Sequence, residues 1–336
     1  MKLIIQIPCL NEEQTLPRTL ADLPLHIDGI DDIELLVIDD GSTDDTVRVA
    51  REHGVHHVVS HNRNKGLAAA FQTGLNAALQ LDADIIVNTD ADNQYPGRFI
   101  PDLVAPIVAR EADMVIGNRQ THKIEHFSPA KKLLQNMGSA VVRYVSGTDV
   151  PDAPSGFRAM SREAALRLNI LTGYTYTLET IIQAGRKNLT VAHVPVETNA
   201  KLRESRLIRS TWRYVLRSAG TILRLFILYK PLRTFSYAAL PFALVGAGLW
   251  LRFVVLWLTG ESARGANIQS ITVGAALIIL SFIIFLMGLM GELIAINRRL
   301  QEETLYYVKN IVLAGQSTEK RYTVPVSDEE TLQVPD

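Results

Sequence analysis

Two carboxylates and a carboxamide follow a short apolar run near residue 90. Residues 85–88 are Ile-Ile-Val-Asn, and residues 90–94 are Asp-Ala-Asp-Asn-Gln. In an open α/β sheet, ligands bind beyond the carboxyl ends of the strands, and oxygen ligands there suit a divalent cation that shares the phosphates of a substrate. The alternative is a polar turn in which Asp92 or Asn93 caps the next helix. Because Asp-x-Asp is common by chance, the choice depends on the rest of the chain.

The elements that would position these carboxylates are short strands that alternate with helices. Apolar runs predict strands at 3–7, 34–38, 57–60, 85–88 and 114–117. Helical spacing of apolar residues predicts helices at 13–23, 43–53, 66–81 and 96–110. This alternation is typical of the α/β class, with a mostly parallel sheet and helices on both faces. Ser42, with Asp45 three residues later, resembles a cap at the start of the second helix.

Polar segments follow the other predicted strands as well. They lie at residues 8–13, 39–42, 62–66 and 117–119. Because the carboxyl ends of parallel strands meet at one edge of a sheet, we expect these segments to form a single site with residues 90–94. This agreement favours the functional interpretation of the two carboxylates.

Four histidines lie close together in the sequence, at 53, 56, 57 and 61. Neighbouring residues of a strand point to opposite faces, so His56 and His57 are poorly placed to share one ion. We expect surface or edge histidines here rather than a metal site.

The charges of the chain are balanced overall but not along its length. The 336 residues carry 34 basic and 35 acidic side chains, which gives no general attraction to nucleic acid. Residues 201–233, however, hold nine basic side chains and one acidic. This asymmetry predicts an anionic surface or substrate as a partner. The single cysteine, Cys9, excludes an internal disulfide and fits a reducing compartment.

Two long apolar stretches lie near the C-terminus. Residues 235–258 contain one charge, Arg252, and residues 271–296 contain one charge, Glu292. Each exceeds the roughly 20 apolar residues that cross a bilayer. Basic residues lie before the first stretch and after the second, so the positive-inside rule predicts a multi-pass protein of the cytoplasmic (inner) membrane with both termini in the cytoplasm.

The segment before the first apolar stretch, residues 205–233, has the pattern of amphipathic helices. Arginines recur on one side, and apolar residues with Trp212 recur on another. A basic face opposite an apolar face predicts helices that lie in the membrane interface and contact its lipids. The last residues, from 315, are polar and show little helical or strand pattern.

Several of these segments together resemble a known family. Besides the segments at the strand ends, the chain has Ser-Gly-Phe-Arg at 155–158, Gly-Tyr-Thr-Tyr-Thr-Leu-Glu at 173–179 and Arg-Glu-Ser-Arg-Leu at 203–207. In this order they resemble the family-2 inverting glycosyltransferases, in particular the dolichol-phosphate mannose synthase and polyisoprenyl-phosphate glycosyltransferase group. The resemblance covers roughly residues 3–230, and any single motif would carry less weight.

The resemblance implies a domain plan. It places a cytoplasmic Rossmann-like GT-A catalytic domain at 1–204 and amphipathic interface helices at 205–233. A two-helix transmembrane region would follow at 234–300, and a cytoplasmic tail at 301–336.

The resemblance also assigns roles to individual residues. The residues that would bind the nucleotide sugar are Pro8, Leu10, Asn11, Glu12, Ile38, Asp40, Ala91, Asp92, Gln94 and Arg119. Those that would hold Mg²⁺ or Mn²⁺ with the donor diphosphate are Asp90, Asp92 and Gln94. Those expected to take part in transfer are Asp90, Asp92, Arg119, Lys131, Glu179 and Arg206.

The expected reaction moves one sugar from a nucleotide sugar to a polyisoprenyl (undecaprenyl or dolichyl) phosphate. The second pKa of a phosphate monoester is about 6, so this acceptor is an anion at neutral pH and needs no general base. It needs cations that hold its oxygen in line with the anomeric carbon, and Arg119, Lys131 and Arg206 are the candidates. Glu179 is then expected to orient sugar hydroxyls or arginines.

Two alternatives stay open at this point. The first is a glycosyltransferase that acts on a hydroxyl of a glycolipid, with Glu179 as the base. The second is a non-catalytic membrane scaffold or flippase partner that retains a nucleotide-sugar-binding fold. The donor is also open, because UDP-sugars are favoured only by their common use and GDP-mannose fits as well. Glycines in the apolar stretches are a weak indication that copies of the chain associate as a homo-oligomer.

Overall fold

The computed structural model describes residues 1–120, 129–170, 176–199, 227–259 and 268–322, together with Gly220 and Arg224. Within these ranges, side chains are described except at 129–137, 268 and 316–322. The chain divides into two compact units. The first contains residues Met1–Ser218 and Leu305–Asp336, and the second contains Ala219–Thr304.

The first unit is built on a seven-stranded sheet. Its strands are β1 (Lys2–Cys9), β2 (Asp32–Asp39), β3 (His57–Ser60), β4 (Ile85–Asn88), β5 (Met114–Asn118), β6 (Arg158–Ser161) and β7 (Val191–Pro195). The strand order is β3-β2-β1-β4-β6-β5-β7, and β6 alone runs antiparallel to its neighbours β4 and β5. The five strands expected from the apolar runs are confirmed, and β6 and β7 are additional.

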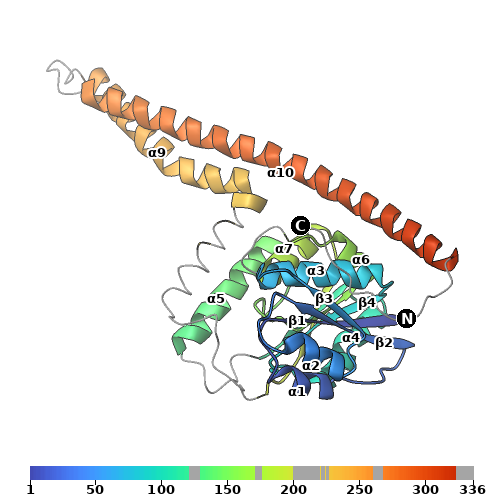
Figure 1. Cartoon of the computed structure of the whole chain (residues 1–336). Coiled ribbons are helices and arrows are strands. Elements are labelled where there is room, and N and C mark those ends of the chain that lie inside the picture. Colours follow the sequence, from blue (N-terminus) through green and yellow to red (C-terminus); the bar gives the residue numbers. More distant parts are fainter. Residues whose placement is uncertain are drawn as a thin grey trace. The chain divides into compact units, whose positions relative to one another are not determined.

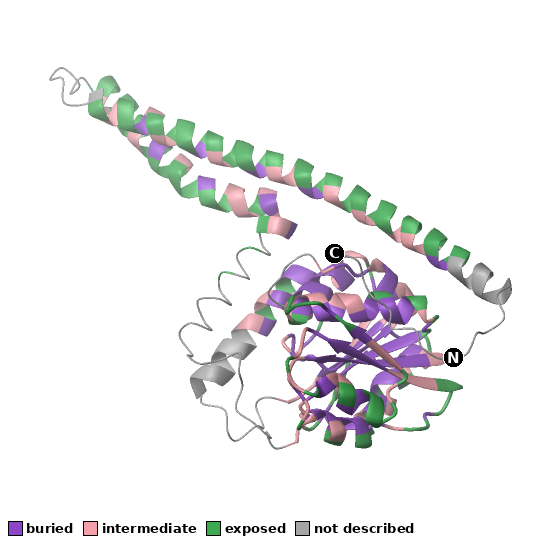
Figure 2. Cartoon of the chain, in the orientation of Figure 1, coloured by how far each residue is buried: buried purple, intermediate pink, exposed green. Residues whose placement is uncertain are grey.

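Helices cover both faces of this sheet. They are α1 (Leu16–Ala21), α2 (Thr46–Glu52), α3 (Leu67–Gln80), η1 (Gly97–Phe99), α4 (Ile100–Val108), α5 (Pro129–Ser146), α6 (Arg162–Arg167) and α7 (Tyr176–Arg186). Helices α1, α2 and α4 lie on one face, and α3, α6 and α7 lie on the other (Figure 1). Because both faces are covered, the central strands are almost wholly buried, as Figure 2 shows.

The helices α1 and α2 begin later than the sequence pattern indicates. Helix α2 begins at Thr46 rather than near Ser42, and its N-cap residue, Asp45, makes no side-chain capping bond. The expected cap at Ser42 is therefore wrong. The Ser42 hydroxyl instead accepts a hydrogen bond from the backbone N–H of Asn11, at 2.9 Å. The residues before the two helices bind each other, and Asp44 also accepts the backbone N–H of Thr46, the first residue of α2, at 3.1 Å.

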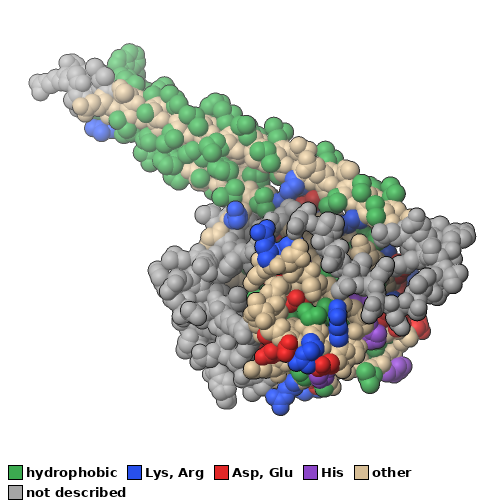
Figure 3. Space-filling model, in the orientation of Figure 1, with side chains coloured by type: hydrophobic (Ala, Val, Ile, Leu, Met, Phe, Trp, Pro, Cys, Tyr) green, Lys and Arg blue, Asp and Glu red, His purple; other side chains and the backbone are tan. Residues whose placement is uncertain are grey.

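The second unit contains most of two long helices. Helix α9 (Pro231–Leu258) and helix α10 (Ile268–Tyr322) include the two apolar stretches and are long and apolar enough to cross a membrane. Their side chains are mostly exposed and hydrophobic (Figures 2 and 3). They pack against each other through small residues, since a Cβ at Gly246 would lie 2.9 Å from the Gly274 carbonyl oxygen.

Helix α10 is longer than the apolar pattern requires. Its 55 residues correspond to about 80 Å at 1.5 Å per residue, whereas a hydrocarbon core is about 30 Å thick. The helix continues unbroken through residues 301–322, although the tail was expected from 301 and little helical or strand pattern was expected from 315. Its residues from Leu305 belong to the first unit.

Candidate active site

The strand register brings the predicted site segments to one edge of the sheet. Cys9 at the end of β1 pairs with Asp39 at the end of β2, and Gln6 pairs with Asn88 at the end of β4. Asn88 in turn pairs with Arg158, the first residue of the antiparallel strand β6. The carboxyl ends of the parallel strands β1, β2 and β4 therefore lie together, as the alternating pattern predicted, and the amino end of β6 lies beside them.

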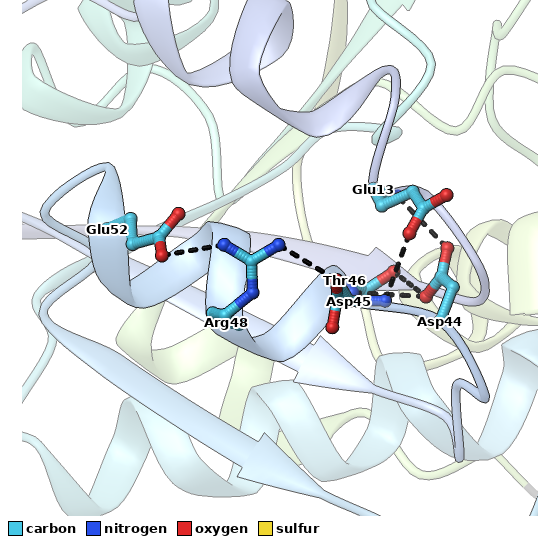
Figure 4. A network of polar contacts seen from close by, with 6 residues as sticks. All are labelled: Glu13, Asp44, Asp45, Thr46, Arg48 and Glu52. Carbon is cyan, nitrogen blue, oxygen red and sulfur yellow. Dashed lines mark hydrogen bonds and ion pairs between the residues drawn. The ribbon is translucent and has the colours of Figure 1, made fainter.

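The loops after β1 and β2 bind each other closely. The backbone N–H of Glu13 donates to Asp44, at 3.2 Å, and the Glu13 carboxylate accepts from the backbone N–H of Asp45, at 3.1 Å (Figure 4). The Asn11 side chain accepts from the backbone N–H of Thr43, at 2.8 Å, and Asn11 itself has φ +55°. These contacts fix the two loops as one rigid rim.

The residues expected to line the nucleotide site from these strands are mainly buried. Pro8 and Ile38 are register partners in the sheet, and the Ile38 side chain lies against Gly74 of α3. Glu12 is buried, and its carboxylate accepts a hydrogen bond from the Thr15 hydroxyl, at 2.6 Å. Leu10, which lies between Pro8 and Glu12 in the sequence, is half-buried. Their contact with a nucleotide stays a prediction.

The carboxylate of Asp40 holds a loop. It accepts hydrogen bonds from the backbone N–H groups of Lys65 and Gly66, both at 2.8 Å, and lies 2.7 Å from His61 Nδ1. The other ring nitrogen of His61 lies 2.9 Å from the Thr73 hydroxyl. His61 is therefore a buried, doubly hydrogen-bonded residue, and the expectation of a surface or edge histidine is wrong at this position. Asp40 therefore shapes the rim where the nucleotide sugar is predicted to bind.

The two carboxylates after β4 lie where the sequence predicted them. Asp90 is half-buried, and a Cβ at Gly156 would lie 3.2 Å from both of its carboxylate oxygens. Asp92 is half-buried, and its carboxylate accepts the backbone N–H of Gln94, at 3.0 Å. Burial and the neighbouring charge of Asp92 raise the pKa of Asp90 to about 7. Two carboxylates held this close together favour a bound cation.

The segment between and after these carboxylates is itself anchored. The Ala91 carbonyl accepts a hydrogen bond from the Thr19 hydroxyl, at 2.9 Å. The carbonyl oxygens of Asn93 and Gln94 both accept from Asn199, through its side chain and its backbone N–H respectively. Asn93 has φ +53°, a left-handed conformation that turns the chain sharply after Asp92. The loop is thus held in shape from two sides.

Residues that the sequence reasoning missed surround Asp90. Asn88 donates from its side chain to the Gly156 carbonyl, at 2.9 Å, and to the Tyr176 hydroxyl, at 3.1 Å. The Tyr95 hydroxyl accepts the backbone N–H of Gly156, at 3.3 Å. Asn88 is a polar residue at the end of an apolar strand, two residues before Asp90, which was an available signal. Tyr176 lies in the 173–179 segment that carries the resemblance, although no role was predicted for it. Tyr95 offered no signal, because its partner Gly156 is distant in sequence.

Arg119 lies at the same edge in a buried ion pair. Its guanidinium donates to both oxygens of Asp152, at 2.7 and 2.8 Å, and its backbone N–H donates to the same carboxylate. The side chains of Arg119 and Asp152 are 13% and 2% exposed. Such a bidentate pair fixes the guanidinium plane, so Arg119 is presented to the site in one orientation. Asp152 was not predicted as a site residue, because no nearby sequence pattern indicates that it pairs with Arg119.

The Ser-Gly-Phe-Arg segment at 155–158 connects the site to helix α7. Arg158 is fully buried and donates to the carbonyls of Ser155 and Thr177 and to the Thr180 hydroxyl. Its guanidinium lies over the ring of Tyr176, 5.3 Å from the centroid. Arg158 therefore joins the segment next to Asp90 to helix α7.

Of the remaining predicted residues, the structure describes the side chain of Glu179 but not those of Lys131 and Arg206. Glu179 is buried in α7, three residues after Tyr176, and accepts a hydrogen bond from the Gln183 side chain, at 3.2 Å. Arg206 lies outside the described residues, and of Lys131 only the backbone, in α5, is described.

The donor set suits a divalent cation that is shared with a substrate. Within the described part of the chain, no three His, Cys, Asp or Glu side chains are grouped closely enough to hold a metal alone. Asp90 and Asp92 offer two carboxylates, and Mg²⁺ commonly binds through one or two carboxylates together with substrate phosphates. The residues present therefore fit a cation completed by a diphosphate.

Comparisons with known proteins identify the family of the chain. Residues 4–168 match the family model described as glycosyl transferase family 2. A UDP-N-acetylglucosamine–dolichyl-phosphate N-acetylglucosaminyltransferase of Methanococcus voltae is 30% identical over 57% of this chain and 83% of its own. An undecaprenyl-phosphate 4-deoxy-4-formamido-L-arabinose transferase of Yersinia enterocolitica is 28% identical over 94% of this chain and 95% of its own.

A solved structure supports the same assignment. Glucosyl-3-phosphoglycerate synthase of Mycobacterium tuberculosis, in complex with Mn²⁺, UDP-glucose and phosphoglyceric acid, superimposes with a TM-score of 0.53. The two chains are 26% identical over 66% of this chain and 79% of the other. The fold and site define a GT-A glycosyltransferase domain. The chain belongs to glycosyl transferase family 2.

Proposed function

We propose that the protein transfers a single sugar, with inversion, from a nucleotide sugar to a polyisoprenyl phosphate at a membrane surface. The observation that carries the proposal is the pair Asp90 and Asp92 at the carboxyl edge of a GT-A sheet, in a chain that also has two helices apolar enough to cross a membrane. The names of relatives from Methanococcus voltae and Yersinia enterocolitica support a polyisoprenyl phosphate as the acceptor.

The donor side of the site is assigned to the rim and the two carboxylates. The loops after β1 and β2 would contact the nucleoside, and Asp90 and Asp92, with Gln94, would bind Mg²⁺ or Mn²⁺ together with the diphosphate. When bound, the cation would stabilise the negative charge that develops on the leaving nucleoside diphosphate. A UDP-sugar is the favoured donor, because the Mycobacterium tuberculosis neighbour was solved with UDP-glucose and Mn²⁺.

The acceptor side requires cations more than it requires a base. A lipid phosphate is already an anion at neutral pH, so the protein must orient it rather than deprotonate it. Arg119, fixed by Asp152, is the cation proposed here from the described residues, and Lys131 and Arg206 complete the proposed set. Glu179 would orient sugar hydroxyls or arginines near the phosphate.

The membrane arrangement is also proposed. Residues 205–233 would lie in the interface, α9 and α10 would cross the inner membrane, and both termini with the active site would face the cytoplasm. This orientation rests on the basic residues that lie before and after the apolar stretches. Gly246 and Gly274 approach each other closely within one chain, as small residues allow between membrane helices. We also propose that several copies of the chain associate as a homo-oligomer.

Divalent metal binding should depend on pH because of Asp90. Its pKa of about 7 means that below neutrality a proton competes with the cation for the carboxylate. We expect the affinity for Mn²⁺ to rise with pH and to level off above about pH 7, with a loss of about tenfold per pH unit well below it. Titration with Mn²⁺ between pH 5 and 8, without donor, measures this. Affinity that is constant below pH 7 would contradict the assignment of Asp90 as a ligand.

The acceptor class can be tested with Glu179→Gln and a matched pair of lipids. With undecaprenyl phosphate as acceptor, we expect the variant to keep a reduced rate, within about tenfold to thirtyfold of the native enzyme, because no general base is needed. Undecaprenol, which has the same chain without the phosphate, should receive no sugar from either protein. The measurement is the rate of label transfer from the nucleotide sugar to each lipid.

The two alternatives predict different outcomes in this experiment. If the acceptor is a glycolipid hydroxyl, Glu179→Gln should abolish turnover and undecaprenyl phosphate should receive no sugar. If the protein is a non-catalytic scaffold or flippase partner, the native protein should bind the donor and transfer it to no acceptor.

A further inference from the structure

The C-terminal part of α10 packs against the α/β domain along one face. Tyr306, Lys309 and Leu313 are less exposed than their neighbours, and their spacing places them on one side of the helix. The Tyr306 hydroxyl lies 3.0 and 3.1 Å from the two carboxylate oxygens of Glu163 in α6. The Arg167 guanidinium lies 4.5 Å from the centroid of the Tyr306 ring. Tyr306 therefore holds this part of α10 against α6.

Lys309 uses this docking to reach a buried residue. Its ammonium group donates to the side-chain oxygen of Asn169, at 2.8 Å, and Asn169 is 8% exposed. Burial, with a smaller contribution from Lys187, lowers the pKa of Lys309 to about 8. A partly buried ammonium loses hydration, and a hydrogen bond to Asn169 offsets part of that cost. The hydrogen bond between Lys309 and Asn169 is therefore more specific than one made by an exposed lysine.

Asn169 is in turn held by the side chain of Gln183. The backbone N–H of Asn169 donates to the Gln183 side-chain oxygen, at 3.0 Å, and the Gln183 amide nitrogen donates to the Asn169 carbonyl. Because the carboxamide meets one donor and one acceptor, its orientation is fixed rather than arbitrary. The same nitrogen also donates to the carboxylate of Glu179, at 3.2 Å. A continuous hydrogen-bonded path thus runs from Lys309 through Asn169 and Gln183 to Glu179.

We infer that Lys309 is a positioning residue for Glu179, acting through Asn169 and Gln183, an inference that rests on the proposed function for the role of Glu179. Lys309 itself does not touch the reacting groups. It stabilises Asn169, whose backbone sets the orientation of the Gln183 carboxamide, and that carboxamide orients the Glu179 carboxylate.

The path gives the long extension of α10 a function. The helix is unbroken from Ile268 to Tyr322, so Lys309 is carried on the same helix as the apolar stretch that is proposed to cross the membrane. The contacts of Tyr306 with α6 and of Lys309 with Asn169 would therefore help to hold Glu179 in one orientation. Truncation or displacement of this segment would leave the fold of the sheet intact but Glu179 less well oriented.

A double-mutant cycle on the full-length protein tests the inference. Lys309→Met keeps most of the side-chain bulk and removes the donor, and we expect it to lower kcat about fivefold to twentyfold with the donor KM within about twofold. In a Glu179→Gln background the same change should cost less than about twofold, because the residue it positions is already altered. Lys309→Arg should restore kcat to within about threefold of the native value.

A matched control and a second readout keep the result unambiguous. Tyr307→Phe alters a neighbouring side chain that is 65% exposed, and it should leave kcat unchanged. Hydrogen exchange of the amides in Tyr176–Arg186 should be faster in Lys309→Met than in Tyr307→Phe. This readout needs no acceptor, so it still tests the path if native protein fails to glycosylate any lipid phosphate, a failure that would count against the proposed function alone.

Three results would overturn the inference. One is an unchanged kcat in Lys309→Met, and another is an equal loss in the native and Glu179→Gln backgrounds, which would show that Lys309 acts independently of Glu179. The third is exchange in α7 that is the same in Lys309→Met and the control.

Discussion

Asp92→Asn is expected to lower kcat for sugar transfer by about a thousandfold or more, with little change in folding stability. The side-chain oxygen of asparagine still accepts the backbone N–H of Gln94, so the loop that Asp92 organises should keep its shape. However, the variant loses the negative charge that would hold the cation and, through the cation, the diphosphate. The change therefore separates the chemical role of the carboxylate from its structural role.

The measurement is the initial rate of transfer at saturating donor, together with Mn²⁺ affinity. Asp28→Asn is a suitable control, because Asp28 is an exposed carboxylate outside the site and its loss should leave the rate unchanged. If Asp92→Asn retained more than about a tenth of the native kcat, the metal assignment would be wrong.

Asp152→Asn should have the largest effect on stability among the residues of the site. The change leaves the buried guanidinium of Arg119 without its counter-charge, and breaking a buried ion pair in this way typically costs about 3–5 kcal/mol. We expect a lower midpoint of thermal or denaturant unfolding for the first unit, and a lower rate of transfer because Arg119 loses its fixed orientation. The measurement is the unfolding transition of the full chain in detergent.

An exposed ion pair in the same unit provides the comparison. Arg48 bridges Asp45 and Glu52 on the surface of α2 (Figure 4). Because exposed pairs contribute little in water, Glu52→Gln should leave the unfolding midpoint unchanged. Equal midpoints for Asp152→Asn and the native protein would contradict the view that Asp152 neutralises Arg119 inside the domain.

The strands and the two carboxylates were predictable because their signals are local. Apolar runs ended by polar residues predicted five strands, and the register confirms that their carboxyl ends share one edge. Strand β6 gave no such signal, since its sequence, Arg-Ala-Met-Ser, begins with the buried charge of Arg158 and contains no apolar run. Its antiparallel insertion between β4 and β5 is set by tertiary packing rather than by alternation along the chain.

The partners of the site residues were less predictable. Asp152 binds Arg119 across 33 positions of sequence, and Tyr176 meets Asn88 across 88. A single sequence does not indicate which of its many polar residues form ion pairs or hydrogen bonds with each other. His61 shows the same limit, because a histidine in a polar segment was expected at the surface and is instead buried between Asp40 and Thr73.

The extension of α10 shows how context changes a weak pattern. Residues 301–322 follow the long apolar stretch and were expected to belong to a cytoplasmic tail. The helix continues because it already has a long preceding segment, so no new helix nucleus is needed. Contacts of Tyr306 and Lys309 with the α/β domain then hold one face of it.

The most direct test of the central proposal is label transfer from a panel of nucleotide sugars to undecaprenyl phosphate. It uses detergent-purified full-length protein with Mn²⁺ or Mg²⁺, and Asp92→Asn in parallel. The proposal predicts one labelled lipid, labile to mild acid, formed from one donor with equimolar release of nucleoside diphosphate and absent with the variant. Metal-dependent donor binding without a lipid product from any donor would contradict transfer to a polyisoprenyl phosphate.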